Sequence, residues 1–179
     1  ARTTTTVFAA EDFGTGTHTA LPTGWSSGTL DVGTWKWTNL PSSSTFSMDT
    51  MASTTSANGW MIFDSDSIGA ATGGTPAGWL QSPAYNCSAH PHVGLVFQDY
   101  YRKFKDSCFI WVSTTPGFAA GTYTKYPVAL NNTVVTNVST ANPATVNIDI
   151  SAVAASQPAV YIRFVTYGPP LGAYSWMID

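Results

Sequence analysis

Charge is scarce in this chain: acidic and basic side chains make up only 9% of it, against about a quarter in an ordinary globular protein. Ten acidic residues outnumber seven basic ones, and the formal net charge is −3. Binding to nucleic acid through its phosphates requires a basic patch or stripe, which so few cations do not supply. The composition therefore argues against nucleic acid as a partner.

Long apolar runs are also missing, because no stretch approaches the roughly 20 residues that a membrane-spanning helix requires. We therefore expect no transmembrane segment. The sequence begins at Ala1 rather than at methionine and shows no signal peptide. We expect a mature or trimmed product, a single domain over residues 1–179 that is a fragment of a longer secreted protein.

Helical periodicity is lacking too, and only the Ala-rich stretch 151–156 has the composition of a helical turn. The chain is rich instead in Ser, Thr and aromatic residues, the last at 13%. Strands are predicted where apolar residues alternate or run together, at residues 2–8, 33–38, 59–63, 79–82, 93–101, 108–112, 133–139, 145–150, 160–166 and 174–178. Strands without helices bury their apolar faces against each other. The fold class predicted is all-β, a two-sheet antiparallel β-sandwich.

The clearest pattern runs from residue 93 to residue 112. Residues 93–101 alternate between apolar and other side chains, whereas 108–112 are apolar almost throughout, which is typical of a strand covered on both faces. The charged run 102–106 between them must be solvated. We predict that the two strands form a hairpin and that the rest of the sandwich packs on it.

Two pairs of residues are candidates for cross-links within the fold. Cys87 and Cys108 each stand beside a predicted strand, so a disulfide is expected if the protein is exported, with two buried free thiols as the alternative. Asp99 and Arg163 each interrupt an apolar strand, where an unpaired charge is costly. We predict a structural ion pair between them, or between Asp99 and Arg102.

Oxygen ligands and aromatic rings are the remaining candidate site residues, because no catalytic constellation stands out. The carboxylates available to calcium are Glu11, Asp12, Asp31, Asp64, Asp66, Asp99 and Asp179, with solvated loop acids as the alternative interpretation. The aromatic residues that could stack on sugar rings are Trp25, Trp79, Tyr100, Tyr101, Tyr123, Tyr126 and Tyr167, with core packing as the alternative.

The order of several segments resembles a known family. These segments are EDF and LPTGW near the start, then W-x-W, ANGWMIFDSD, WLQSPAYNCSAHPHVGLVFQDYYRKFKDSCFIWVST, VNIDISAVAASQPAVYIRFVTYG and, at the end, YSWMID. Together they resemble the cleaved-adhesin or choice-of-anchor J modules of gingipain-type adhesins and other bacterial surface proteins, distant relatives of MAM domains. The resemblance covers nearly the whole chain and implies a jelly-roll, galactose-binding-like sandwich.

The resemblance also implies site residues. Family members often hold calcium near the E-D-F segment and the terminal Asp, which correspond here to Glu11, Asp12 and Asp179. Asp64 and Asp66, which open like a calcium loop, complete the expected structural calcium site. If the source is such a bacterium, Thr50 and Ser67 match an Asp-Ser/Thr-apolar pattern of O-glycosylation.

The function that the resemblance implies is a non-catalytic adhesion or accessory module of an exported bacterial protein, secreted to the cell surface by a type IX system. Its partners would be surface glycans or proteins, other copies of the chain, or neighbouring domains. One alternative is a carbohydrate-binding module attached to a secreted enzyme. Another is a structural subunit of a surface filament, in which the edge strand at residues 2–8 is added to a neighbouring sheet.

Overall fold

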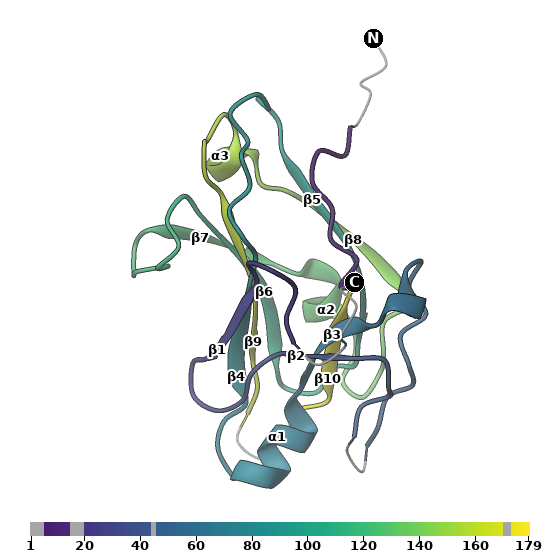
Figure 1. Cartoon of the computed structure of the whole chain (residues 1–179). Coiled ribbons are helices and arrows are strands. Elements are labelled where there is room, and N and C mark those ends of the chain that lie inside the picture. The colour runs from purple at the N-terminus through teal and green to yellow at the C-terminus, as the bar shows by residue number, and fades with distance from the viewer. Residues whose placement is uncertain (1–5, 15–19, 44–45, 170–172) are drawn as a thin grey trace.

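Two antiparallel sheets of five strands each face one another, the first on the left and the second on the right of Figure 1. The computed structural model describes residues 6–14, 20–43, 46–169 and 173–179. The first sheet has the order β1 (Ser26–Thr29), β4 (Ala77–Gln81), β9 (Tyr161–Tyr167), β6 (Ser107–Ser113) and β7 (Tyr123–Pro127). The second has the order β2 (Lys36–Thr38), β3 (Trp60–Asp64), β10 (Ser175–Ile178), β5 (Gly94–Tyr101) and β8 (Ala144–Asp149). The predicted all-β sandwich of jelly-roll type is confirmed.

The core lies between the two sheets and is built from alternate residues of their strands. Ile162 and Phe164 of β9 belong to it, whereas Arg163 between them faces outward. Phe97 and Tyr101 of β5 enter the same core from the second sheet. This is the alternation by which the sequence predicted both strands, since neighbouring side chains of a strand point to opposite faces.

The predicted hairpin between β5 and β6 is wrong. β5 pairs with β10 and β8 in the second sheet, whereas β6 pairs with β9 and β7 in the first. The charged run 102–106 therefore carries the chain from one sheet to the other. The interpretation of β6 as covered on both faces holds, because Ile110 lies in the core and Trp111 in an outer aromatic cluster.

The helices are short and sit in the connections. The largest, α1 (Ser65–Thr72), lies partly in the expected loop 69–78, and Gly73 ends it in the left-handed conformation with φ 67°. The helix α2 (Ala129–Thr133) and a turn occupy the region of the expected strand 133–139, which does not form. The predicted helical turn is α3 (Ser151–Ala154), and a 3-10 turn spans Ser56–Asn58.

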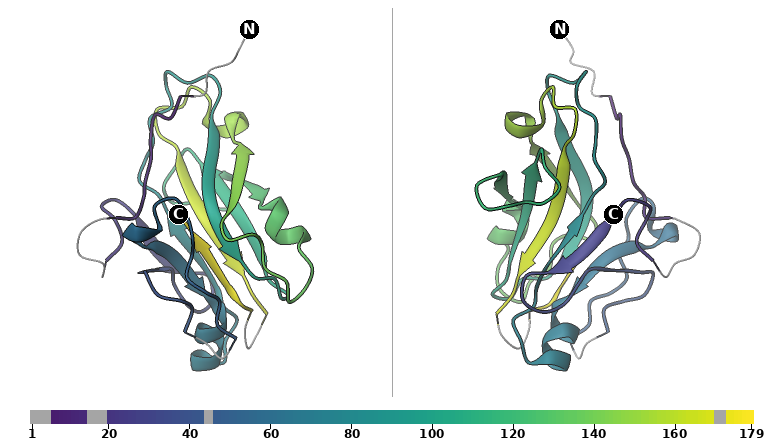
Figure 2. Two further views of the ribbon diagram at one scale, coloured as in Figure 1. Left: turned by 90° about the vertical axis from the view of Figure 1, so that its right-hand side faces the viewer. Right: turned by 60° about the vertical axis from the view of Figure 1, so that its left-hand side comes forward.

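The described N-terminal segment runs along the sandwich toward the C-terminus, as both views of Figure 2 show. The strand expected at residues 2–8 lies mostly outside the described residues, and residues 6–8 themselves are not part of a strand. Among the helices of the described chain, none is long and apolar enough to cross a membrane.

Candidate functional site

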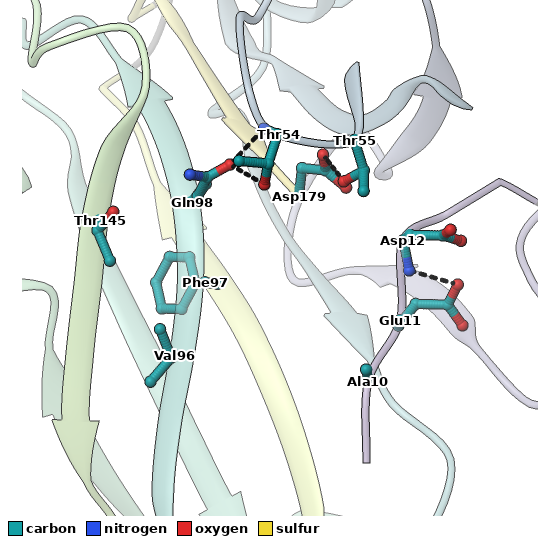
Figure 3. Close-up of a pocket in the computed structure, with 10 residues that line it drawn as sticks. All are labelled: Ala10, Glu11, Asp12, Thr54, Thr55, Val96, Phe97, Gln98, Thr145 and Asp179. Carbon is teal, nitrogen blue, oxygen red and sulfur yellow. Dashed lines mark hydrogen bonds between the residues drawn. The ribbon is translucent and has the colours of Figure 1, made fainter. Parts of the chain in front are cut away.

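A pocket of about 600 Å³ lies where the N-terminal segment meets the end of β10 (Figure 3). We call it the acidic pocket, and its polar lining consists of Glu11, Asp12, Thr54, Thr55, Gln98, Thr145 and Asp179. The structure thus brings together three of the five carboxylates predicted to bind calcium, from the two ends of the described chain.

Two of these carboxylates are held by local hydrogen bonds. Glu11 Oε1 accepts the backbone N–H groups of Asp12 and Phe13, at 3.1 and 2.9 Å, and Oε2 accepts Trp25 Nε1 at 3.1 Å. Asp12 accepts Asn58 Nδ2 at 3.0 Å. The E-D-F turn is therefore fixed in place with its acids beside the pocket.

Asp179 presents a different environment. Its Oδ2 accepts hydrogen bonds from the hydroxyls of Ser53 and Thr55, both at 2.5 Å, and its backbone pairs with Gln98. Its Oδ1 is buried and has no hydrogen-bond partner among the described residues. A buried carboxylate oxygen without a donor is costly, and a cation would satisfy it.

Carboxylate and hydroxyl oxygens are the ligands that calcium takes, so the acidic pocket fits the ion by donor type. In the part of the chain that the structure describes, however, no three His, Cys, Asp or Glu side chains lie close enough together to hold a metal. Glu11, Asp12 and Asp179 therefore border one space without forming a closed ligand set.

Asp64 and Asp66 do not belong to this set, so their inclusion was wrong. Asp64 pairs with Ser175, which begins β10, whereas Asp179 follows its end. The four residues from Ser175 to Asp179 span about 13 Å at ~3.3 Å per residue of strand. Its carboxylate accepts hydrogen bonds from Ser43 and Ser175, each at 2.9 Å. Asp66 lies in the first turn of α1. Asp64 is thus buried where β3 passes into α1, and neither acid lies beside the acidic pocket.

A second cavity of about 760 Å³ adjoins the acidic pocket and shares Glu11, Phe97 and Asp179 with it. We call it the inter-sheet cavity. Its walls are mainly apolar, and Phe8 stacks on His90 beside it at 4.0 Å between ring centroids. Burial raises the pKa of the Cys87 thiol and, with the charge of Glu11 adding to it, raises the pKa of Tyr85 to about 12. Neither side chain is therefore ionised near neutral pH.

The expected disulfide between Cys87 and Cys108 is wrong, since both cysteines are free and buried. Cys108 pairs with Thr166 near the end of β9. The segment that contains Cys87 lies beside Val160, the residue just before β9 begins. Six residues of extended chain separate these positions, about 20 Å. A disulfide requires Cα atoms within about 7 Å.

The expected ion pair between Asp99 and Arg163 is also wrong. Asp99 of the second sheet points into the core, whereas Arg163 of the first sheet points outward. Asp99 is fully buried and accepts hydrogen bonds from Asn131 Nδ2 at 2.7 Å and Trp176 Nε1 at 3.1 Å. Burial raises its pKa from 3.8 to about 6. Arg163 instead packs on the outside of the first sheet, and Arg102 also lies elsewhere, over the ring of Tyr174.

The outside of the first sheet carries a cluster of aromatic side chains, which we call the aromatic face. Its members come from β4, β6, β7, β9 and the loop before β7: Trp79, Phe109, Trp111, Phe118, Tyr123, Tyr161 and Tyr167. Trp111 and Phe118 are buried, and the other five are partly exposed. Sequence reasoning singled out only Trp79, Tyr123 and Tyr167 among them.

The aromatic face is ordered by close ring contacts. Tyr123 stacks on Trp111 at 4.4 Å between centroids, and Lys125 Nζ lies 4.9 Å from the Trp111 ring. Trp79 lies over Gly28 of β1, where a Cβ atom would come within 2.3 Å of the indole. Only glycine at that position leaves the Trp79 ring room to lie against the sheet.

The other aromatic candidates pack inside the fold. Tyr100 and Tyr101 are buried, and Trp25 and Tyr126 pack against the core. Two members of the aromatic face that sequence reasoning missed, Phe109 and Trp111, could have been found from the alternation of β6. Their side chains point to the face opposite the one that enters the core.

The two expected glycosylation residues differ in exposure. Thr50 is exposed in a loop. Ser67 is partly buried in α1, and its hydroxyl accepts a hydrogen bond from the Ser43 hydroxyl at 3.2 Å. Modification of either remains a prediction.

No protein-family model and no curated protein matches the sequence. Among solved structures, the fold is similar to that of the K1 cleaved adhesin domain of Lys-gingipain from Porphyromonas gingivalis W83. The TM-score is 0.55 and the identity 18%, over 94% of this chain and 92% of that chain. At this identity the likeness establishes a shared fold, and the fold expected from the resemblance to cleaved-adhesin modules is confirmed.

A second solved structure is described as showing the promiscuous specificity of carbohydrate-binding modules from the β-sandwich superfamily. It matches with a TM-score of 0.37 and 10% identity, over 87% of this chain and 55% of that chain. A likeness at this level supports no inference about the present chain.

Proposed function

We propose that this chain is a non-catalytic binding module of adhesive type, carried to the bacterial cell surface by an exported protein. Its attachment surface is the aromatic face. The likeness in fold to an adhesin domain over nearly all of both chains supports this role. The observation that carries the proposal is the set of partly exposed rings on the outside of the first sheet.

The position of these rings is what makes them informative. In an antiparallel sandwich the inner face of each sheet is apolar, and the outer face commonly carries polar side chains toward water. Here Trp79, Tyr123, Tyr161 and Tyr167 are only partly covered. Because a cluster of aromatic side chains left partly open to solvent is typical of an interaction site, we assign binding to this face.

Two titratable side chains of the inter-sheet cavity are poorly suited to catalysis at neutral pH. Cys87 lines the inter-sheet cavity beside Ser82 and Ser151, but burial raises the pKa of its thiol, and a thiolate is needed for attack. Tyr85 has a pKa of about 12 and is a poor base at neutral pH. The carboxylates of Glu11 and Asp12 accept hydrogen bonds that hold the N-terminal turn.

A carbohydrate-binding module that serves a neighbouring enzyme is the second candidate function. The same aromatic face favours it, since flat, partly exposed rings are suited to contact with the apolar faces of sugar rings. A glycan array separates the two roles: a carbohydrate-binding module recognises one polysaccharide class, whereas an adhesin for proteins recognises none.

We also propose that calcium, when present, binds in the acidic pocket through Glu11, Asp12 and Asp179. The support is the donor type of these residues and the unpartnered Oδ1 of Asp179. The ion would be structural, offsetting two of the three negative charges and tying the N-terminal segment to the end of β10.

The function is tested by adhesion of the purified chain to surfaces coated with polysaccharides and with proteins. Tyr123→Ala removes a partly exposed ring from the aromatic face. We expect its binding to fall about tenfold, the change that corresponds to ~1.4 kcal/mol.

Phe46→Ala is the matched control, because Phe46 is an aromatic residue that is 58% exposed and contacts Tyr174 away from the aromatic face. Its binding should equal that of the wild type. Equal losses in both variants, or none in Tyr123→Ala when its melting temperature is unchanged, would refute the assignment of the surface.

A further inference from the structure

Arg163 is an unusual residue on the aromatic face because its charge is nearly buried without a counter-charge. It lies in the middle of β9, between Trp111 of β6 and Gln81 of β4, and is only 9% exposed. No carboxylate of the described residues forms an ion pair with it. Burying an unpaired charge is costly, and burial lowers the pKa of Arg163.

Its guanidinium group is held in place by neutral contacts. The Cζ atom lies 4.0 Å from the ring centroid of Trp79 and 4.2 Å from that of Phe118. The Nε atom donates a hydrogen bond of 2.8 Å to Gln81 Oε1. Contacts between a cation and ring faces are attractive, so these neighbours orient the group without neutralising it.

The backbone at Phe118 supports this interpretation. Phe118 has a positive φ of 48°, a conformation that is rare for a bulky side chain. Such outliers persist where the surrounding structure requires them and cluster at binding sites. Here the strained residue places its ring against Arg163.

The end of the guanidinium group remains free. Its Nη1 and Nη2 atoms make no hydrogen bond to any residue that the structure describes, although five N–H groups are available on an arginine. A planar guanidinium with its Nε occupied presents two parallel N–H groups at its end, which is the geometry that binds a carboxylate bidentately.

A second cation, Lys125, lies in the same row of cross-strand neighbours as Arg163. Trp111 pairs with Arg163 on one side and with Lys125 of β7 on the other, so the two cations stand two strands apart, roughly 10 Å. Lys125 is exposed. The partly exposed rings of Tyr123 and Tyr161 flank this row.

We propose that the aromatic face binds an acidic polysaccharide of the uronate type. Arg163 holds the carboxylate of one sugar end-on, the exposed rings stack on the sugars, and Lys125 meets a further carboxylate along the chain. The net charge of −3 disfavours polyanions in general, so the preference for a carboxylate rests on the local arrangement of Arg163 and Lys125. This inference rests on the proposed function and adds the chemical class of the ligand.

The test compares binding of polygalacturonate and of its methyl ester, which has the same rings without the charge, by titration calorimetry. We expect the wild type to prefer the acid by about tenfold, in line with the greater strength of charge-assisted hydrogen bonds. Arg163→Lys, which keeps the charge but loses the planar fork, should lose most of this preference. Lys36→Gln removes an exposed cation from the second sheet and should retain the preference.

Equal affinity of the wild type for acid and ester, or tighter binding of poly-L-glutamate, would overturn the inference. If acid and ester bind equally and Tyr123→Ala weakens both, binding by the aromatic face is supported and recognition of the carboxylate is refuted. If neither polysaccharide binds, the uronate proposal is wrong, and adhesion to other coated surfaces decides the proposed function. If Arg163→Lys does not fold, Lys125→Gln replaces it and should bind the acid several-fold more weakly.

Discussion

Replacement of Asp99 by asparagine should change how the stability of the sandwich depends on pH. Asp99 is fully buried, and its carboxylate accepts hydrogen bonds from Asn131 and Trp176. Desolvation raises its pKa from 3.8 to about 6, against the opposing effect of these two hydrogen bonds. Its Oδ1 has no partner among the described residues. Asn is nearly isosteric with Asp and carries no charge at any pH.

The size of the effect follows from the shift in pKa. The folded state binds the proton more tightly than the unfolded chain, so Asp99 contributes its stability below pH 4 and loses it as the pH rises to about 6. A shift from 3.8 to about 6 corresponds to about 3 kcal/mol at 1.36 kcal/mol per pH unit. Relative to the wild type, Asp99→Asn should therefore gain about 3 kcal/mol between pH 4 and pH 7.

The assay is urea unfolding of both proteins at pH 4, 5, 6 and 7. Other groups titrate in this range, because burial also raises the pKa of Asp106 and local hydrogen bonds lower that of Asp149. Their contributions largely cancel in the difference between the two proteins. A difference that stays constant with pH, or a variant that loses stability toward pH 7 relative to the wild type, would refute the reasoning about Asp99.

Three further predictions follow from the described contacts. Cys87 and Cys108 are buried free thiols, so a thiol reagent should modify them only after unfolding, and a reductant should leave the melting temperature unchanged. Gly28→Ala would place a Cβ atom 2.3 Å from the Trp79 indole, so we expect about 1–3 kcal/mol of destabilisation in urea and weaker adhesion. Calcium at 100 times its dissociation constant should add about 2.7 kcal/mol, seen as a chelator-sensitive melting temperature that Asp179→Asn abolishes; no shift with chelator would remove the calcium proposal.

The sequence predicted the layers of the fold better than the pairing of its strands. Alternating apolar residues in β5 and β9 determine which side chains enter the core, and that information is local. The partner of a strand is chosen by contacts across the whole chain, so adjacent strands such as β5 and β6 were wrongly joined in a hairpin.

The candidate site shows the same division. Sequence reasoning identified Asp99 and Arg163 as the charges that need compensation, because each interrupts an apolar strand. It could not identify the neutral groups that hold them, since Asn131 and Gln81 come from distant segments. The calcium candidates Glu11, Asp12 and Asp179 were grouped because of the family resemblance, since no local sequence pattern links them. In the structure all three line the acidic pocket.

The aromatic face was only partly predictable for a related reason. Its rings come from four strands and a loop, so no single stretch of sequence displays the cluster. Each strand supplies one or two aromatic residues at outward positions, which look like ordinary core residues until the sheet is assembled. Phe118 in particular lies in a turn-rich segment and gave no signal.

The most direct test of the central claim is to map where a bound polysaccharide contacts the chain, by NMR chemical-shift changes during titration. We expect the shifts to cluster on β6, β7 and β9, with the largest changes at Tyr123, Tyr161 and Arg163. Changes confined to the acidic pocket or the inter-sheet cavity would contradict the assignment of binding to the aromatic face.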